Sequence, residues 1–212
     1  MHNKGRESSN KNKNGSERVA IFIDGSNFYH SVKETSGLHD NEIDFAKMIE
    51  TLRSKRLLIG TYYYNAPLDR GYNESIYWKQ QKFFSELRKI PEFNLILCRM
   101  RKIKDPDGKT KFMVKGDDIY LATDMISLAY EDAYDTAIIV TGDGDFVPAI
   151  KKVQKLGKKV ENAFFKISSS NYLKNVCNKS VRLDDYIFDC IRKKKGKVTL
   201  RPTNSSCFLA IS

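Results

Sequence analysis

Residues 136–148 read TAIIVTGDGDFVP, and this stretch decides the fold. An apolar, β-branched run opens it, and a glycine-punctuated acidic turn follows. Continuous apolar runs bounded by turn residues are typical of strands that are buried on both faces of a parallel sheet. The turn carries Asp143 and Asp145. It therefore lies at the carboxyl end of a strand, where open α/β sheets place their ligands.

A second stretch, VAIFIDGSN at residues 19–27, has the same pattern and ends its apolar run at Asp24. Right-handed crossovers would make these two strands neighbours at the point where the strand order reverses, and their aspartates would then meet. Each aspartate also has a simpler explanation. Asp24 could cap a helix, and Asp145 could cap the helix that follows the acidic turn.

Predicted strands alternate with amphipathic helices, and a basic hairpin interrupts them. The strands are expected at 18–23, 57–65, 93–98, 137–141 and 159–165, and the hairpin at 99–114. This alternation predicts an α/β fold, a three-layer sandwich with a mostly parallel central sheet. We expect one domain at 18–190, preceded by a disordered basic tail at 1–17 and followed by a basic, mobile tail at 191–212.

The composition of the 212 residues is that of a globular protein, with 41% hydrophobic and 30% charged residues. No apolar run approaches the ~20 residues that span a bilayer, and the polar N-terminus is not a secretory signal, so we expect no membrane association and a cytoplasmic location. Four widely spaced cysteines without a C-x-x-C pair argue against zinc and disulfides. The net charge of +11 favours a nucleic-acid partner, although basic tails and solubility would also explain it.

The acids at strand ends and helix starts form the predicted site. They are Asp24, Asp118, Asp143 and Asp145, with Asp117 and Asp124 as possible additions. Carboxylates that lie this close repel one another, and a hard cation with oxygen ligands, Mg²⁺ or Mn²⁺, relieves the repulsion. Asp118 could instead complement a helix dipole. Asp124 lies on a different helix face from Asp118, so a structural hydrogen bond is its better explanation.

Basic side chains accompany these acids. Arg99, Arg101 and Lys102 lie on the hairpin and Lys115 follows it, where they would neutralise substrate phosphates, or the hairpin could be a solvated arm. Acids that hold a cation beside a basic surface point to phosphodiester hydrolysis. We therefore expect a nucleic-acid substrate.

Three motifs, in this order and spacing, resemble the NYN domain, in particular its LabA-like branch within the PIN-like nuclease superfamily. They are FIDGSN at 22–27, KGDDIYLATDM at 115–125 and VTGDGDF at 140–146. The resemblance implies a Rossmann-like sandwich and a metal-dependent ribonuclease. It also implies that Asp24, Asp118 and Asp143 hold the metal, with Asp145 as a fourth contributor.

By the same resemblance, Asn27 would orient Asp24 or contact the scissile phosphate, Ser26 and Thr141 would support the ligands through their hydroxyls, and Lys115 would meet phosphate. The chain departs from the LabA-like pattern at Asp117, where an apolar residue is usual, and at Thr141, where serine is more frequent.

With this resemblance we expect a metal-dependent endoribonuclease that is a monomer or weak homodimer. Its expected substrate is RNA, single-stranded by preference, and the sequence does not exclude DNA. The first alternative is a non-catalytic nucleic-acid-binding regulatory module that retains the acidic pocket. A phosphatase acting on small phosphoesters would need an enclosed phosphate pocket, and the sequence has no G-x-x-x-x-G-K-[ST] loop.

Overall fold

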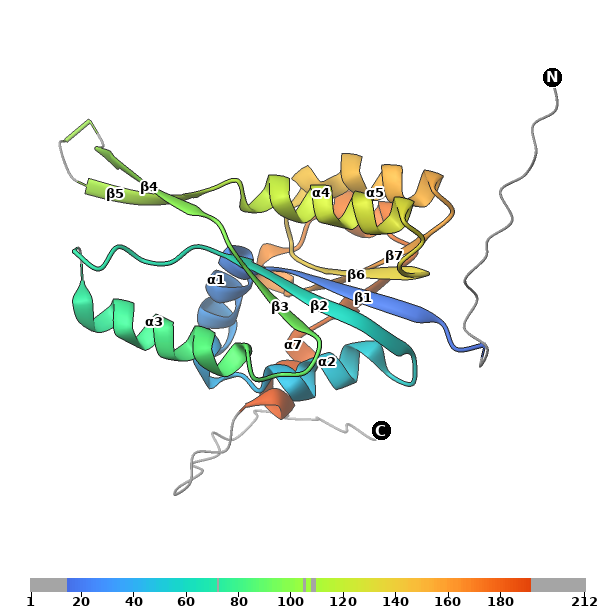
Figure 1. Ribbon diagram of the computed structural model, residues 1–212, viewed down its shortest axis with the longest axis horizontal. Coiled ribbons are helices and arrows are strands. Elements are labelled where there is room, and N and C mark those ends of the chain that lie inside the picture. The colour runs from blue at the N-terminus through green and yellow to red at the C-terminus, as the bar shows by residue number, and fades with distance from the viewer. Residues whose placement is uncertain (1–14, 72, 105, 108–109, 192–212) are drawn as a thin grey trace, which may run out of the picture.

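The computed structural model describes residues 15–71, 73–104, 106–107 and 110–191 (Figure 1). The two predicted tails fall mostly outside this part of the chain. Glu17, the last residue of the predicted N-terminal tail, accepts a hydrogen bond from the Thr136 hydroxyl at 2.6 Å. Ile191, the first residue of the predicted C-terminal tail, forms an antiparallel bridge with Ile43.

A six-stranded sheet in the order β3-β2-β1-β6-β7-β8 forms the middle layer, and every strand pair in it is parallel. This confirms the predicted α/β sandwich. The strands are β1 (Arg18–Asp24), β2 (Leu57–Asn65), β3 (Phe93–Leu97), β6 (Thr136–Val140), β7 (Lys159–Phe164) and β8 (Lys179–Arg182). A separate antiparallel hairpin of β4 (Arg99–Lys104) and β5 (Thr110–Lys115) leaves the sheet after β3, as the sequence predicted.

The two central strands are neighbours, which confirms the adjacency inferred from the crossover rule. β1 and β6 pair in parallel with Ile23 opposite Val140. All residues of both strands are buried, because helices cover both faces of the sheet there. Asp24 therefore ends one strand beside the point where the acidic turn leaves the other.

Helices form the two outer layers (Figure 1). On one face lie α1 (Gly25–Ser36), α2 (Phe45–Arg53), α3 (Glu74–Leu87) and α7 (Asp184–Ile187), whose apolar side chains share one core cluster. On the other face lie α4 (Asp117–Tyr130), α5 (Val147–Lys155) and α6 (Asn171–Val176). Short 3₁₀ turns complete the chain at η1 (Asp40–Glu42), η2 (Gly144–Phe146), η3 (Lys166–Ser168) and η4 (Phe188–Cys190). Among the described residues, no helix combines the length and apolar character needed to cross a membrane.

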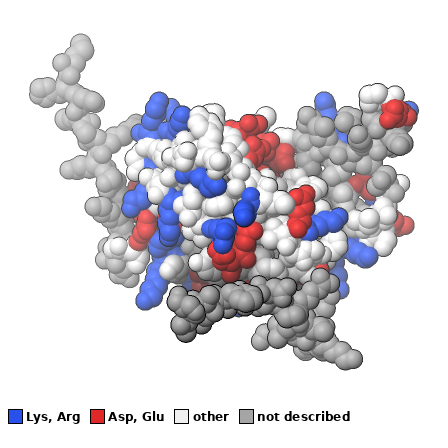
Figure 2. All heavy atoms as spheres, turned by 180° about the vertical axis from the view of Figure 1, so that it is seen from behind, with Lys and Arg blue, Asp and Glu red and all other residues white. Residues whose placement is uncertain are grey.

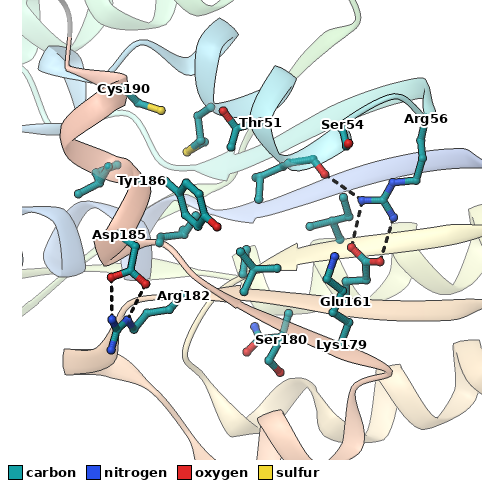
Figure 3. A pocket seen from close by; sticks show the side chains of 18 residues that line it. Thr51, Ser54, Arg56, Glu161, Lys179, Ser180, Arg182, Asp185, Tyr186 and Cys190 are labelled. Carbon is teal, nitrogen blue, oxygen red and sulfur yellow. Dashed lines mark hydrogen bonds and ion pairs between the residues drawn. The ribbon is translucent and has the colours of Figure 1, made fainter.

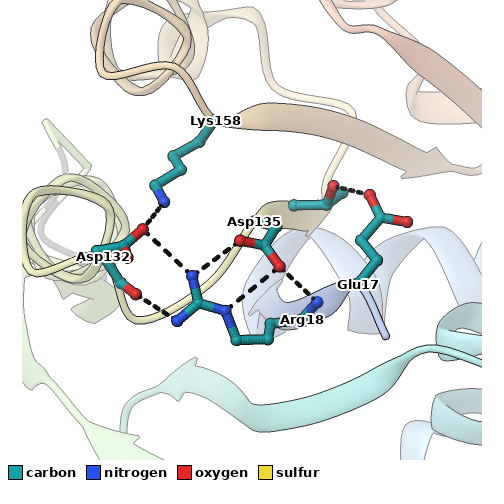
Figure 4. A network of polar contacts seen from close by, with 6 residues as sticks. Glu17, Arg18, Asp132, Asp135 and Lys158 are labelled. Carbon is teal, nitrogen blue, oxygen red and sulfur yellow. Dashed lines mark hydrogen bonds and ion pairs between the residues drawn. The ribbon is translucent and has the colours of Figure 1, made fainter. Parts of the chain in front are cut away.

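Ion pairs hold the amino edge of the sheet, opposite the acidic turn (Figure 4). The Arg18 guanidinium reaches Asp135 at 2.8 Å and Asp132 at 3.2 Å, and Lys158 also contacts Asp132. The arginine holds the pKa of the Asp135 carboxyl below its ordinary value, chiefly through the hydrogen bond. This network ties the start of β1 to the loops that enter β6 and β7.

Candidate active site

Asp24 links the two central strands. Its carboxylate is 6% exposed and accepts hydrogen bonds from the Asn27 backbone N–H and from the Thr141 hydroxyl, both at 3.0 Å. Burial raises the pKa of Asp24 to about 6, against the effect of these two donors, and the charges of Asp118 and Asp117 raise it further. The aspartate thus caps α1, as its simpler explanation required, and is also the most perturbed acid of the cluster.

Side chains of the site hold the acidic turn after β6. Thr141 accepts a hydrogen bond from the Asp143 backbone N–H at 3.1 Å, and the Asp143 carboxylate accepts one from the Asp145 N–H at 2.9 Å. The Asn27 side-chain oxygen accepts one from the Gly142 N–H at 3.0 Å. The Asn27 backbone therefore orients Asp24, while its side chain fixes the turn.

The loop around η3 covers this turn, a contact that sequence reasoning missed. A Cβ atom at Gly142 would lie 1.8 Å from the Ser168 carbonyl oxygen, so only glycine fits there. The Ser31 hydroxyl of α1 donates to the Ser168 hydroxyl at 2.8 Å. The only signal in the sequence was Gly142 itself, which predicts a tight turn but not the segment that crosses it.

The first turn of α4 adds two more acids. Gly116 precedes it with φ of +89°, a conformation that favours glycine, and lets the chain turn from β5 into the helix. Partial burial raises the pKa of Asp118, and the charges of Asp117, Asp143 and Asp145 raise it further. Segments far apart in the sequence therefore place their carboxylates within electrostatic reach of one another.

Asp124 has a separate role, because it accepts a hydrogen bond from the Tyr64 hydroxyl at 2.9 Å. This agrees with the structural explanation that its position on the helix favoured. Ser26 is half-buried in the first turn of α1.

The chemistry of the acid cluster fits a hard cation. Its donors are oxygen atoms, which hard cations prefer, and the nearby Cys98 thiol has a pKa raised to about 11, first by burial and then by the neighbouring acids. Burial first, and then repulsion by neighbouring aspartates, raises the pKa values of Asp24 and Asp118, and a bound cation would relieve the repulsion. Within the described residues, no three acidic, histidine or cysteine side chains are already arranged to hold an ion. The ligand set therefore stays a prediction.

The predicted phosphate-binding residues lie on the hairpin that projects beyond the sheet (Figure 1). Arg99 and Arg101 are exposed on β4. The side chains of Lys102 and Lys115 fall outside the described part of the structure. On the face seen from behind the view of Figure 1, basic residues are interspersed with acidic ones (Figure 2). The net charge alone therefore marks no site on that face.

A cavity of about 440 Å³ lies away from the acids of the candidate site, between α2, α7 and the strands β6–β8 (Figure 3). Four of the charged groups that line it form two ion pairs: Arg56 pairs with Glu161 at 2.9 Å, and Arg182 with Asp185 at 2.6 Å. None of the predicted site residues lines it. The cavity is thus separate from the candidate active site.

An α/β sandwich with acids clustered at the carboxyl edge of a parallel sheet is the arrangement of a PIN-like nuclease domain. The family model of the NYN domain matches residues 18–184, and the chain belongs to this family. NYN domains are PIN-like, their members are generally nucleases, and such domains generally use divalent metals. The LabA-like branch stays a prediction.

A solved structure supports the fold. The crystal structure of VPA0982, a protein of unknown function from Vibrio parahaemolyticus, superposes with a TM-score of 0.65 and 23% sequence identity. The match covers 82% of this chain and 98% of that one. No curated protein matches the chain.

Proposed function

We propose that the protein is a divalent-metal-dependent endoribonuclease. The observation that carries the proposal is the electrostatic coupling of Asp24, Asp117, Asp118, Asp143 and Asp145 at the carboxyl edge of β1 and β6. The fold brings these acids together from three separate segments. Capping of the individual helices would not require the acids to lie at one place.

In this proposal Asp24, Asp118 and Asp143 hold Mg²⁺ or Mn²⁺, and Asp145 contributes a fourth carboxylate. When bound, such an ion lowers the pKa of water and polarises the scissile phosphoryl group. Thr141 fixes the orientation of Asp24 through its hydroxyl, and Asn27 holds the turn that carries Asp143.

RNA is the proposed substrate, with the unpaired strand preferred. The exposed Arg99 and Arg101 of the hairpin contact its phosphates, and we propose the same role for Lys102 and Lys115. We also propose that the domain acts as a monomer or weak homodimer. Within its family we assign it to the LabA-like branch.

The test is cleavage of an end-labelled single-stranded RNA by purified protein with Mg²⁺, with Mn²⁺ and with chelator. The variants are Asp24→Asn and Asp143→Asn. The matched control is Asp189→Asn, an exposed acid on η4, which packs against α2 on the other side of the sheet from α4. We expect metal-dependent cleavage by the wild type and the control, and a loss of at least a hundredfold in both site variants.

A second candidate function, a non-catalytic nucleic-acid-binding module, is favoured by the absence of a preformed three-ligand site among the described residues. It predicts RNA binding without cleavage at any metal concentration. Equal cleavage by the wild type and both site variants would exclude the acid cluster as the catalytic centre.

A further inference from the structure

Some cations of the described residues are paired with carboxylates, whereas others lie on aromatic rings. At the amino edge, Arg18 and Lys158 pair with Asp132, and Arg56 pairs with Glu161. Their side chains are at most 17% exposed, so these charges are used within the fold. They have little capacity left for a polyanion.

Other cations rest on aromatic rings instead. The described residues contain four such contacts: Lys33 on Tyr29, Arg70 on Trp78, Lys151 on Tyr172 and Lys174 on Phe164. Within the described part of the chain, Arg70 pairs with Glu74, whereas the three lysines form no ion pair with a carboxylate. A ring positions a cation without neutralising it, so these charges stay available to a ligand.

Tyr172 and Lys151 form the most open of the lysine pairs. The Tyr172 side chain is exposed on α6, with 57% of its surface accessible, and the Lys151 ammonium lies 5.4 Å from its ring centre and 3.3 Å from its hydroxyl. Lys174, also on α6, reaches the Ser169 hydroxyl at 3.4 Å. An exposed ring with an unpaired lysine beside it is the combination that binds single-stranded nucleic acid, by stacking on bases and by contact with phosphates.

The fold places this group beside the candidate active site. Ser170 caps α6, and its hydroxyl lies 3.1 Å from where a Cβ of Gly144 would be, so α6 begins directly against the acidic turn. Because α6 follows β7 and the basic hairpin follows β3, the two lie toward opposite ends of the strand order, with β1 and β6 between them. The helix α6 leads from β7 to β8, and β8 lies two strand spacings, about 10 Å, from β6, the strand that carries the acidic turn.

We propose that Tyr172 and Lys151 form a binding subsite for an unpaired nucleotide of the substrate. The strand then runs along the carboxyl edge from the hairpin, across the acids, to α6, where a base stacks on Tyr172. This inference rests on the proposed function for the identity of the substrate. A base in a duplex is already stacked and paired, so the subsite selects single strands.

The test measures binding of a fluorescent single-stranded RNA 12-mer, and of its duplex, by anisotropy in chelator, where no cleavage occurs. Tyr172→Leu removes the ring and keeps apolar bulk, and Tyr172→Phe keeps the ring. The matched control is Tyr130→Leu, because Tyr130 is 68% exposed at the other end of α4, next to the loop that enters β6.

We expect Tyr172→Leu to weaken single-strand binding about tenfold or more, the range for one stacked base, and to leave duplex binding unchanged. Tyr172→Phe and Tyr130→Leu should stay within about twofold of the wild type. Lys151→Gln should lower the slope of log affinity against log salt by about 0.7, the value for one phosphate contact to a single strand. The exposed Lys155, one turn further along α5, is the control, and its glutamine variant should leave the slope unchanged.

Wild-type affinity in Tyr172→Leu, with metal-dependent cleavage intact, would overturn the subsite and leave the nuclease proposal standing. Equal losses for single strand and duplex would overturn the stacking role of Tyr172. A wild-type protein that binds no RNA would overturn both proposals.

Discussion

Replacing Asp24 by asparagine should make the metal-free protein more stable at neutral pH while abolishing the proposed activity. The Asp24 carboxylate is buried, and its pKa is raised to about 6 from the ordinary 3.8. A raised pKa means that the folded state holds the proton more tightly than the unfolded chain. The contribution of Asp24 to the free energy of unfolding is therefore highest below pH 4 and is lost as the pH rises toward 6 and above.

The size of this loss follows from the two pKa values. Their difference corresponds to about 3 kcal/mol at pH 7. Asparagine is nearly isosteric, keeps an acceptor for the Asn27 N–H and can donate to the Thr141 hydroxyl oxygen. A less favourable hydrogen bond would cost about 1 kcal/mol. We therefore expect Asp24→Asn to be more stable by about 1–2 kcal/mol.

The assay is urea unfolding in chelator at pH 7.5 and at pH 4, with Asp189→Asn as the exposed control. The stability gain of Asp24→Asn should be present at pH 7.5 and should disappear at pH 4, where wild-type Asp24 is protonated. Groups that do not interact with Asp24 affect both proteins alike, so the difference between the two proteins reports on Asp24 and on Asp117 and Asp118, whose charges act on it.

An Asp24→Asn protein that is no more stable than the wild type at pH 7.5 would refute the reasoning. A gain of equal size at both pH values would also refute it, because the stabilisation would then not come from the ionisation of Asp24.

Two further predictions concern the framework of the site. Gly142→Ala should destabilise the protein by about 1–3 kcal/mol, because its Cβ would meet the Ser168 carbonyl, and it should reduce cleavage by moving the acidic turn; urea unfolding and the RNA assay measure both effects. Arg18→Gln should cost about 1–2 kcal/mol at pH 7, with the partly exposed Asp132 and Asp135 keeping the loss modest. Arg18 lowers the pKa of Asp135, and Lys158 followed by Arg18 lowers that of Asp132. The contribution of Arg18 to stability is therefore present above about pH 4 and is lost as the pH falls through the lowered pKa values, so the difference from wild type should shrink in urea titrations at pH 3.

The sequence by itself determined the fold class and most of the elements. The apolar runs at 19–23 and 136–140 are short, rich in β-branched residues and without polar alternation, which is typical of strands that are buried on both faces. Asp44 caps α2 and Gly37 ends α1 in the left-handed conformation, and such caps are local hydrogen-bond and dihedral requirements that a sequence shows directly. Parallel crossovers have one hand, so the adjacency of β1 and β6 also followed from the order of the strands.

Only the tertiary structure decided how the site is held together. The contact of Ser168 with Gly142, the hydrogen bond from Gly142 to the Asn27 side chain and the bond from Tyr64 to Asp124 join residues far apart in the sequence. No local pattern encodes such contacts. The perturbed pKa of Asp24 likewise depends on burial and on the charges of another segment. Sequence thus identified which acids reach one edge of the sheet, and packing determined which of them are coupled there.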